Sequence, residues 1–161
     1  KDLVPYIDNN YPTLKSRESR AITGLSMGGQ GAMYLAIRHL DIFGIAGSTS
    51  GGVDIREFPE SWNMKELLGE KRKNKKIWNE FSIYNQIENL NIGDLKIIID
   101  CGTEDFFYNV NNNLHKKLLK RGIKHDYTVR HGAHNLEYWN SSIEYQLLFF
   151  KNNLLYHELV Y

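Results

Sequence analysis

The chain has 161 residues, with 20 basic and 19 acidic side chains and a formal net charge of +1. This length suits one domain with a core of its own and is short for two, so we expect a single domain over residues 1–161. The balanced charge excludes the strong positive field that gathers nucleic acid or anionic membranes. No uninterrupted apolar stretch has the length of a membrane span. We therefore expect a small neutral substrate, and neither nucleic acid nor a membrane as partner.

The cysteine and histidine content argues against disulfides and metals. Cys101 is the only cysteine, so no internal disulfide is possible and the redox compartment stays open. The first residues lack the apolar core of a signal peptide, which indicates a soluble protein, either cytoplasmic or secreted or periplasmic with its leader removed. The histidines lack metal-ligand spacing, so we expect no metal and no cofactor.

Short apolar runs and amphipathic segments alternate along the chain. A helix is predicted for residues 2–10, ending before Pro12 because a residue that precedes proline avoids helical angles. The periodicity further predicts strands at 20–23, 43–48, 95–100 and 124–130, and helices at 30–40, 108–121 and 136–154. Strands that alternate with helices in this order form a parallel sheet flanked by helices, so the predicted fold class is α/β.

The long segment of residues 53–94 is predicted to be an excursion of short helices between two core strands. Such excursions often form a substrate wall, and Trp62 and Trp78 are candidates for it. The alternative is that these aromatic side chains belong to the core, as aromatic residues at helical spacing more often do. The basic cluster of residues 71–76 is interpreted as a solvated face.

The helix predicted for residues 136–154 is the longest of the chain. Its apolar residues recur at intervals of three and four. We expect them to form one buried stripe: Leu136, Trp139, Ile143, Leu147, Phe150 and Leu154.

The most informative motif is Gly-Leu-Ser-Met-Gly-Gly at residues 24–29, which follows a predicted strand and opens a predicted helix. A serine at the tip of a strand-to-helix turn takes strained backbone angles, and glycines remove the Cβ atoms that would clash there. This G-x-S-x-G pattern predicts Ser26 as the nucleophile of a serine hydrolase and the Met27 backbone N–H as an oxyanion donor. The alternative is that Ser26 is only part of a turn.

A serine hydroxyl needs a histidine to take its proton, and that histidine needs a carboxylate to orient it. In hydrolases with this elbow the order along the chain is serine, acid, histidine, with the acid and the histidine in loops after strands. Asp105 and His134 fit that order. Asp100 and Glu104 compete for the role of the acid, and His131 competes for that of the base. The other histidines are interpreted as polar residues of helix or strand surfaces: His39, His115, His125 and His157.

Three separated segments together resemble one family. They are the motif at 24–29, Asp-Cys-Gly-Thr-Glu-Asp-Phe-Phe-Tyr at 100–108 and Gly-Ala-His-Asn-Leu-Glu-Tyr-Trp at 132–139. The chain resembles the esterase D-like family of α/β-hydrolases, which includes feruloyl esterases attached to xylanases, tributyrin-type esterases, S-formylglutathione hydrolases and the antigen 85 mycolyltransferases. Residues 2–11 also look like the helix that precedes the elbow strand in that family.

Carried over residue by residue, the resemblance implies Ser26 as nucleophile, Asp105 as triad acid and His134 as general base, with the Met27 amide as an oxyanion donor. Leu136 stands where feruloyl and tributyrin-type members often carry an aromatic residue. We therefore include Leu136 among the candidates for the substrate wall, and we do not single out a hydroxycinnamoyl substrate.

The resemblance covers the whole chain but only the later part of the family's fold. We therefore expect a partial α/β-hydrolase domain without the N-terminal strands, in which the strand at 20–23 lies at the edge of the sheet. An apolar edge strand invites pairing, so we expect a homo-oligomer through this edge or a missing segment to complete the sheet. The second oxyanion donor would come from the missing part, and losing it costs about 10²–10³ in turnover.

The leading functional hypothesis is a serine carboxylic-ester hydrolase that works through an acyl-enzyme. A carbohydrate-linked acyl ester is the expected substrate, and this expectation rests on the resemblance alone. The alternatives are acyl transfer to a sugar hydroxyl by the same triad, and an inactive partial domain that binds a partner or a carbohydrate.

Overall fold

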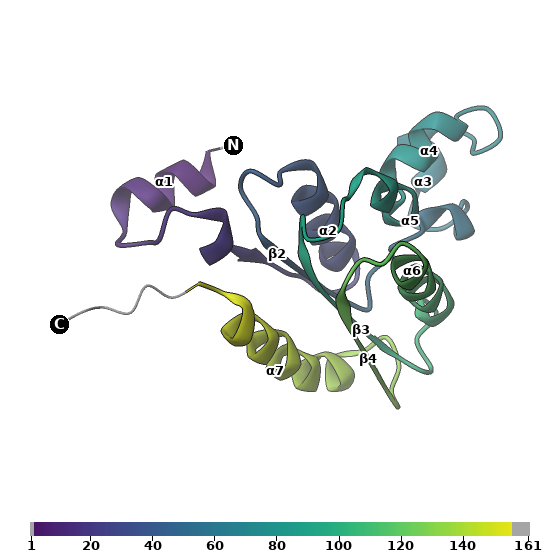
Figure 1. Ribbon diagram of the computed structural model, residues 1–161. Helices are drawn as coiled ribbons and strands as arrows, with labels where there is room; N and C mark the ends of the chain where they lie inside the picture. The colour runs from purple at the N-terminus through teal and green to yellow at the C-terminus, as the bar shows by residue number, and fades with distance from the viewer. Residues whose placement is uncertain (1, 156–161) are drawn as a thin grey trace.

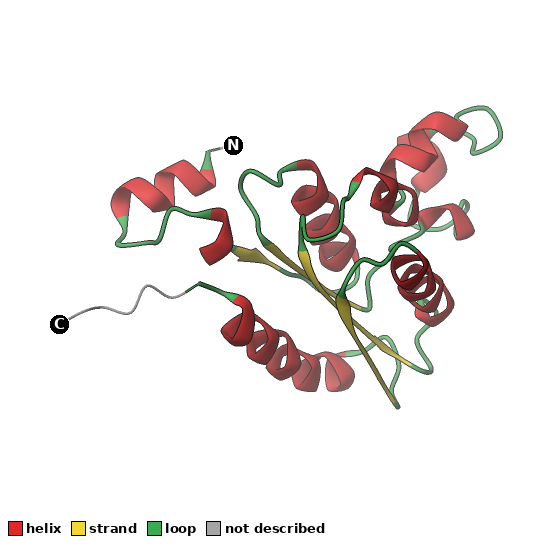
Figure 2. Cartoon of the chain, viewed as in Figure 1, coloured by secondary structure: helices red, strands yellow, loops and turns green. Residues whose placement is uncertain are grey.

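The fold is built on one sheet of four parallel strands. Figures 1 and 2 show the computed structural model, which describes residues 2–155. The strands lie side by side in chain order as β1 (Ala21–Ile22), β2 (Ile45–Thr49), β3 (Lys96–Gly102) and β4 (His125–Arg130). All three neighbouring pairs are parallel. The predicted α/β class is therefore confirmed. His157, interpreted above as a surface residue, lies outside the described residues.

Helices cover both faces of the sheet (Figure 1). Because side chains alternate between the faces of a strand, Ile97 and Ile99 of β3 face one way and Ile98 the other. Ile97 and Ile99 join a core cluster with residues of α2 (Met27–Arg38), α5 (Ile83–Gln86) and α6 (Tyr108–Lys120). Ile98 packs with Phe149 and Phe150 of α7 (Leu136–Asn153). The remaining long helix, α1 (Leu3–Asn10), precedes the sheet.

The segment between β2 and β3 forms the predicted excursion of short helices. It contains η2 (Ile55–Glu57), α3 (Met64–Leu68), α4 (Lys75–Phe81), α5 and η3 (Ile87–Asn89). Trp78 of α4 is fully buried, and its indole Nε1 donates to the Gly69 carbonyl over 2.9 Å. The predicted solvated face holds for Arg72, Lys73, Lys75 and Lys76, which are exposed, whereas Lys71 is partly buried.

The buried face of α7 differs from the predicted stripe. Leu136 is 68% exposed and Leu147 58% exposed, and Ile143 is exposed as well, so this part of the expectation was wrong. Residues spaced by three or four along another face are buried instead: Tyr138, Ser142, Gln146, Phe149 and Phe150. Of the predicted stripe, Phe150 is buried, and Leu154 and Trp139 are partly buried.

Hydrogen bonds to the sheet select this face of α7. The Gln146 Oε1 atom accepts from the Thr23 hydroxyl over 3.0 Å, next to β1. The Ser142 Oγ atom accepts from the Arg130 guanidinium over 2.6 Å, at the end of β4. A hydrogen bond lowers the cost of burying a polar atom, and it does so for Ser142 Oγ and Gln146 Oε1, whereas the buried Gln146 Nε2 has no partner among the described residues. No helix among residues 2–155 combines the length and apolar character needed to cross a bilayer.

Candidate active site

Ser26 lies in the turn between β1 and α2, with backbone angles φ 54° and ψ −119°. A positive φ is unusual for a residue with a side chain and indicates local strain. Close packing explains two of the neighbouring glycines, because a Cβ at Gly24 would overlap the backbone of Gly28, and one at Gly29 would lie 2.7 Å from the Ser48 hydroxyl. A Cβ at Gly28 meets nothing within 4 Å, so this glycine is not required for space.

The end of β2 holds the serine turn in place. The Ser26 amide donates to the Thr49 carbonyl over 2.9 Å, and the Thr49 amide donates back to the Gly24 carbonyl over 3.0 Å. The Ser26 carbonyl accepts from the amides of Gly29 and Gln30. Within the described residues, the Met27 N–H has no such acceptor, which leaves it available to an oxyanion beside Ser26.

Two loops at the carboxyl ends of β3 and β4 lie against each other. The Thr103 amide donates to the Arg130 carbonyl and the Glu104 amide to the Gly132 carbonyl, each over 2.9 Å. A Cβ at Gly102 would overlap the Gly132 carbonyl, so the loops approach as closely as two backbones can. These bonds extend the β3–β4 ladder and bring the loop with Asp105 beside the loop with His134.

Ser26, His134 and Asp105 form a continuous hydrogen-bonded chain. The His134 Nδ1 atom lies 2.9 Å from Asp105 Oδ2, and its Nε2 atom lies 2.9 Å from Ser26 Oγ. The Asp105 carboxylate is fully buried, and its Oδ1 atom accepts from the Phe107 amide over 2.8 Å. An ionised carboxylate only accepts, so Nδ1 carries the imidazole proton and Nε2 accepts from the serine hydroxyl. The arrangement can deprotonate the Ser26 hydroxyl.

The competing residues make other contacts. Asp100 is fully buried and accepts from the Tyr138 hydroxyl and from the Arg130 guanidinium, the latter over 3.1 Å. Burial raises the pKa of Tyr138, and the hydrogen bond to Asp100 raises it further, so this phenol stays a donor. His131 and Glu104 are exposed at the surface, with His131 Nδ1 3.7 Å from Glu104 Oε1.

Aromatic rings surround the His134 imidazole. Its ring centroid lies 4.3 Å from that of Phe106, 4.8 Å from that of Trp139 and 5.5 Å from that of Phe107. Phe58 packs edge to face on Phe107, with centroids 5.1 Å apart. These four aromatic residues, with Trp62, are called the aromatic wall below.

The three residues predicted as candidates for a substrate wall lie in different environments. Trp62 is 51% exposed, and its ring lies 6.0 Å from that of Phe106, so it belongs to the aromatic wall. Trp78 is fully buried within the excursion, as the core alternative predicted, so it is not part of the aromatic wall. Leu136 is exposed at the start of α7, two residues after His134.

Sequence reasoning missed four members of the aromatic wall, for three different reasons. Phe106 and Phe107 follow Asp105 directly. Since Asp105 was predicted to contact the catalytic histidine, its two neighbours in the sequence could have been predicted to lie near that histidine as well. Trp139 lies one turn after His134 and was assigned to the core. Phe58 carries no local signal, because the excursion brings it to the site from a different part of the chain.

The Cys101 thiol is unreactive, and the described residues do not form a metal site. Burial raises the pKa of the Cys101 thiol, and the Asp105 and Asp100 carboxylates add to this shift, so the thiol stays protonated. Within residues 2–155, no three His, Cys, Asp or Glu side chains are grouped in a way that could hold a metal ion.

A serine elbow, an acid loop and a histidine loop at the carboxyl edge of a parallel sheet define the α/β-hydrolase fold. Solved structures agree with this class. A ferulic acid esterase superposes with a TM-score of 0.76 at 27% identity, over 95% of this chain and 58% of its own. The fluorophosphonate-binding serine hydrolase FphF of Staphylococcus aureus, at 22% identity, shares the fold with a TM-score of 0.79, over 92% of this chain and 60% of its own.

A comparison with models of protein families identifies the family of this chain. The profile of the family described as "Putative esterase" matches residues 1–150, and the chain belongs to this family. An acetyl esterase of Caldicellulosiruptor saccharolyticus is 28% identical over 156 residues, which are 88% of this chain and 58% of the relative. The chain thus spans a little over half the length of that relative. The α/β-hydrolase fold and the esterase resemblance inferred from the sequence are confirmed.

Proposed function

We propose that the protein is a serine carboxylic-ester hydrolase that uses Ser26, His134 and Asp105 as its catalytic residues. The observation that carries this proposal is the continuous chain of two 2.9 Å hydrogen bonds from Ser26 through His134 to Asp105. Membership of the esterase family supports the same chemistry.

In this mechanism the Ser26 oxygen attacks the ester carbonyl while its proton passes to His134 Nε2. The Met27 N–H donates to the oxyanion of the tetrahedral intermediate. His134 then gives its proton to the leaving alcohol oxygen as the ester C–O bond breaks, which leaves an acyl group on Ser26. Water attacks this acyl-enzyme by the same route and releases the acid. Asp105 stays ionised throughout and stabilises the imidazolium.

The proposed substrate is an acyl ester of a carbohydrate. Two similar proteins support this class, one named an acetyl esterase and one a ferulic acid esterase. The half-exposed ring of Phe106 beside His134, and that of Trp62 next to Phe106, offer flat apolar surfaces of the kind on which a sugar ring or an aromatic acyl group packs.

The test is hydrolysis of p-nitrophenyl acetate and butyrate by the wild-type protein and by Ser26→Ala. We expect release of p-nitrophenol by the wild type with an initial burst, and at least about 10³-fold slower release by Ser26→Ala. Equal rates for the two proteins would contradict the proposal and would favour a domain that only binds. Hydrolysis of acetylated or feruloylated oligosaccharides then tests the substrate class.

We also propose that β1 pairs with another chain or segment. Among the described residues β1 is hydrogen-bonded on one side only, to β2. Beside it lies an apolar cavity of about 560 Å³, lined in part by Leu14, Ile22 and Leu154. Light scattering during size-exclusion chromatography measures the mass in solution, and a monomer would contradict pairing between two copies.

A further inference from the structure

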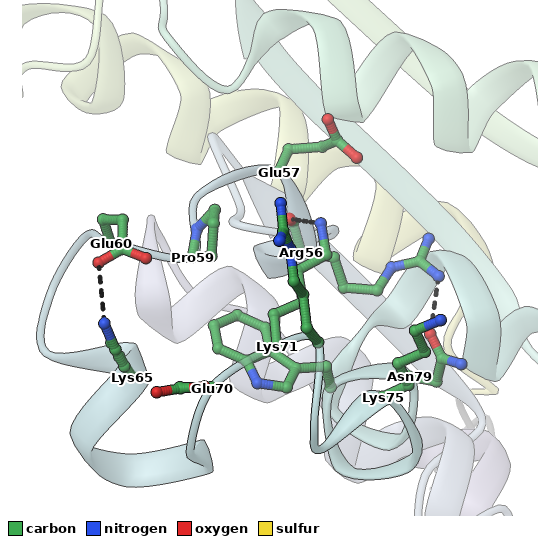
Figure 3. Close-up of a pocket in the computed structure, with 11 residues that line it drawn as sticks. Arg56, Glu57, Pro59, Glu60, Lys65, Glu70, Lys71, Lys75 and Asn79 are labelled. Carbon is green, nitrogen blue, oxygen red and sulfur yellow. Dashed lines mark hydrogen bonds and ion pairs between the residues drawn. The ribbon is translucent and has the colours of Figure 1, made fainter.

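A second cavity lies in the excursion between β2 and β3, outside the triad. It has a volume of about 810 Å³, within the range of cavities that hold small ligands. Figure 3 shows side chains from η2, α3, α4 and the loops between them around this cavity. Its lining is mostly charged: Arg56, Glu57, Pro59, Glu60, Lys65, Glu70, Lys71, Arg72, Lys75, Trp78 and Asn79.

The lining charges do not cancel. Arg56 is paired with Asp54 over 2.7 Å, and Glu70 with Lys73 over 2.9 Å, so each has a partner from outside the lining. Lys65 and Glu60 face each other at 3.9 Å. Lys71, Arg72 and Lys75 have no carboxylate within 4 Å in the part of the chain that the structure describes, which leaves three cations against Glu57.

Hydrogen bonds fix the loop that carries Lys71 and Arg72. The Trp78 indole donates to the Gly69 carbonyl, and the Glu70 carbonyl accepts from the amides of Lys73 and Asn74. The Lys71 ammonium donates to the Arg56 carbonyl, which ties the basic loop to η2. The loop and η2 are therefore tied together, while Arg72 and Lys75 line the cavity and are also exposed to solvent.

The mixture of charges selects the kind of ligand. A polyanion such as nucleic acid would meet Glu57 and Glu60 as well as the cations, and like charges in contact are costly. A ligand with one carboxylate and several hydroxyl groups fits better, because the cations bind the carboxylate while Glu57 and Asn79 accept from or donate to hydroxyls. A uronic acid has this chemistry.

The cavity and the triad share one segment of chain. Arg56, Glu57 and Pro59 line the cavity, while Phe58 between them packs on Phe107 of the aromatic wall. A sugar chain bound in the cavity therefore lies against the same short segment that borders the triad.

We propose that this cavity binds the acidic sugar of a carbohydrate substrate, with Lys71, Arg72 and Lys75 as the cations that bind its carboxylate. The assignment rests on the proposed carbohydrate-ester function. It makes residues 53–94 the part of the protein that distinguishes acidic from neutral carbohydrate.

The test is calorimetric titration of the Ser26→Ala protein, which cannot turn over, with a trimer of galacturonic acid and with the neutral galactose trimer. We expect the acidic trimer to bind at least about tenfold more tightly, with an affinity that falls as salt rises. Equal affinities, or tighter binding of inorganic phosphate than of the acidic trimer, would overturn the proposal.

A matched pair of variants locates the site. Lys75→Gln and Lys76→Gln remove the same charge from adjacent residues of α4, but only Lys75 lines this cavity. We expect Lys75→Gln, alone or with Arg72→Gln, to weaken binding of the acidic trimer by about tenfold, and Lys76→Gln by less than about twofold. Equal losses in both variants would show a diffuse field and overturn the assigned site.

The two proposals fail separately. Ser26-dependent hydrolysis of p-nitrophenyl acetate without binding of the acidic trimer would contradict the proposed sugar site and support the proposed esterase activity. Binding of the acidic trimer that Lys75→Gln weakens, in a protein without esterase activity, would contradict the proposed function and leave the cavity as a site for acidic sugars only.

Discussion

The triad loops and the excursion of residues 53–94 meet at Phe106 and Phe107, but they are held in place by different forces. The triad loops continue a parallel ladder, and backbone hydrogen bonds of 2.9 Å join them beyond the ends of β3 and β4. The excursion contains short helices with few ladder contacts, and it is fixed by side chains such as Trp78 and Arg56.

This difference assigns different tasks to the two regions. A reaction that moves protons over single hydrogen bonds needs donor and acceptor held within a few tenths of an ångström, which a backbone ladder provides. Recognition of a substrate tolerates more adjustment, and side-chain contacts can change without disturbing the sheet. The predictions below test whether the two regions respond separately.

The largest expected effect is on catalysis in the triad loops. We expect Asp105→Asn to lower kcat for p-nitrophenyl acetate by about 10⁴-fold with little change in unfolding, because an amide favours the wrong imidazole tautomer. The matched control is Asp100→Asn, which weakens a buried contact with Arg130 and Tyr138. Asp100→Asn should lower the unfolding free energy by about 2 kcal/mol, and it should lower kcat much less than Asp105→Asn does. A larger loss of kcat in Asp100→Asn would give the acid role to Asp100.

In the excursion, the largest effect is expected from Trp78→Ala. Removing a fully buried indole costs about 3–5 kcal/mol, and the loss should fall on residues 53–94 because Trp78 packs within them. Limited proteolysis with mass spectrometry should place the new cleavage sites there. Trp78→Phe, which loses the hydrogen bond to Gly69 but keeps most of the apolar contact, should cost about 1–2 kcal/mol. New sites spread evenly over the chain would show that the two regions unfold as one.

A smaller effect is expected from Gly102→Ala, which forces the triad loops apart because the new Cβ overlaps the Gly132 carbonyl. We expect a loss of about 2 kcal/mol of unfolding free energy together with a lower kcat. Gly31→Ala is the control, since its Cβ meets nothing within 4 Å in α2 and should stabilise by up to about 1 kcal/mol. Thermal unfolding of both variants measures the difference, and an unperturbed Gly102→Ala would contradict the close approach of the loops.

The smallest effect lies away from both regions, where His115 Nδ1 of α6 is 2.7 Å from His125 Nε2 of β4. Burial lowers the pKa of His115, and the neighbouring His125 lowers it further. The unfolded chain therefore binds a proton more tightly than the folded one, and stability falls as pH drops through about 6.5, the ordinary histidine value. The melting temperature should drop less between pH 7.5 and 5.5 in His115→Gln. An identical drop in both proteins would assign the pH dependence to other groups.

Much of the fold could be predicted because it follows from local patterns. The alternation of β-branched runs and amphipathic helices predicted the parallel sheet, and the motif at residues 24–29 predicted the turn that carries Ser26. Asp105 and His134 follow strands in the order that the chemistry requires. The structure places the His134 imidazole within hydrogen-bonding distance of both the Asp105 carboxylate and the Ser26 hydroxyl. Their catalytic roles remain our proposal.

The errors arise where contacts distant in sequence decide burial. Gln146 and Ser142 are buried in α7 because Thr23 and Arg130 offer them partners, and no pattern within the helix contains that information. For Trp78 the sequence left both the substrate wall and the core open, and its buried indole, which donates to the Gly69 carbonyl, agrees with the core alternative. Hydropathy ranks side chains by their average environment and does not register a partner from another element.

The parallel pairing of β2 and β3 has a consequence for how this protein can change. Thr49 is opposite Asp100 and Ile45 opposite Lys96, so the chain leaves one end of the sheet after β2 and must return to the other end before β3. Parallel neighbours always require such a crossover. Residues 53–94 are therefore exchangeable but not dispensable: an engineer seeking a new specificity can replace the segment, provided that the replacement still bridges the length of the sheet.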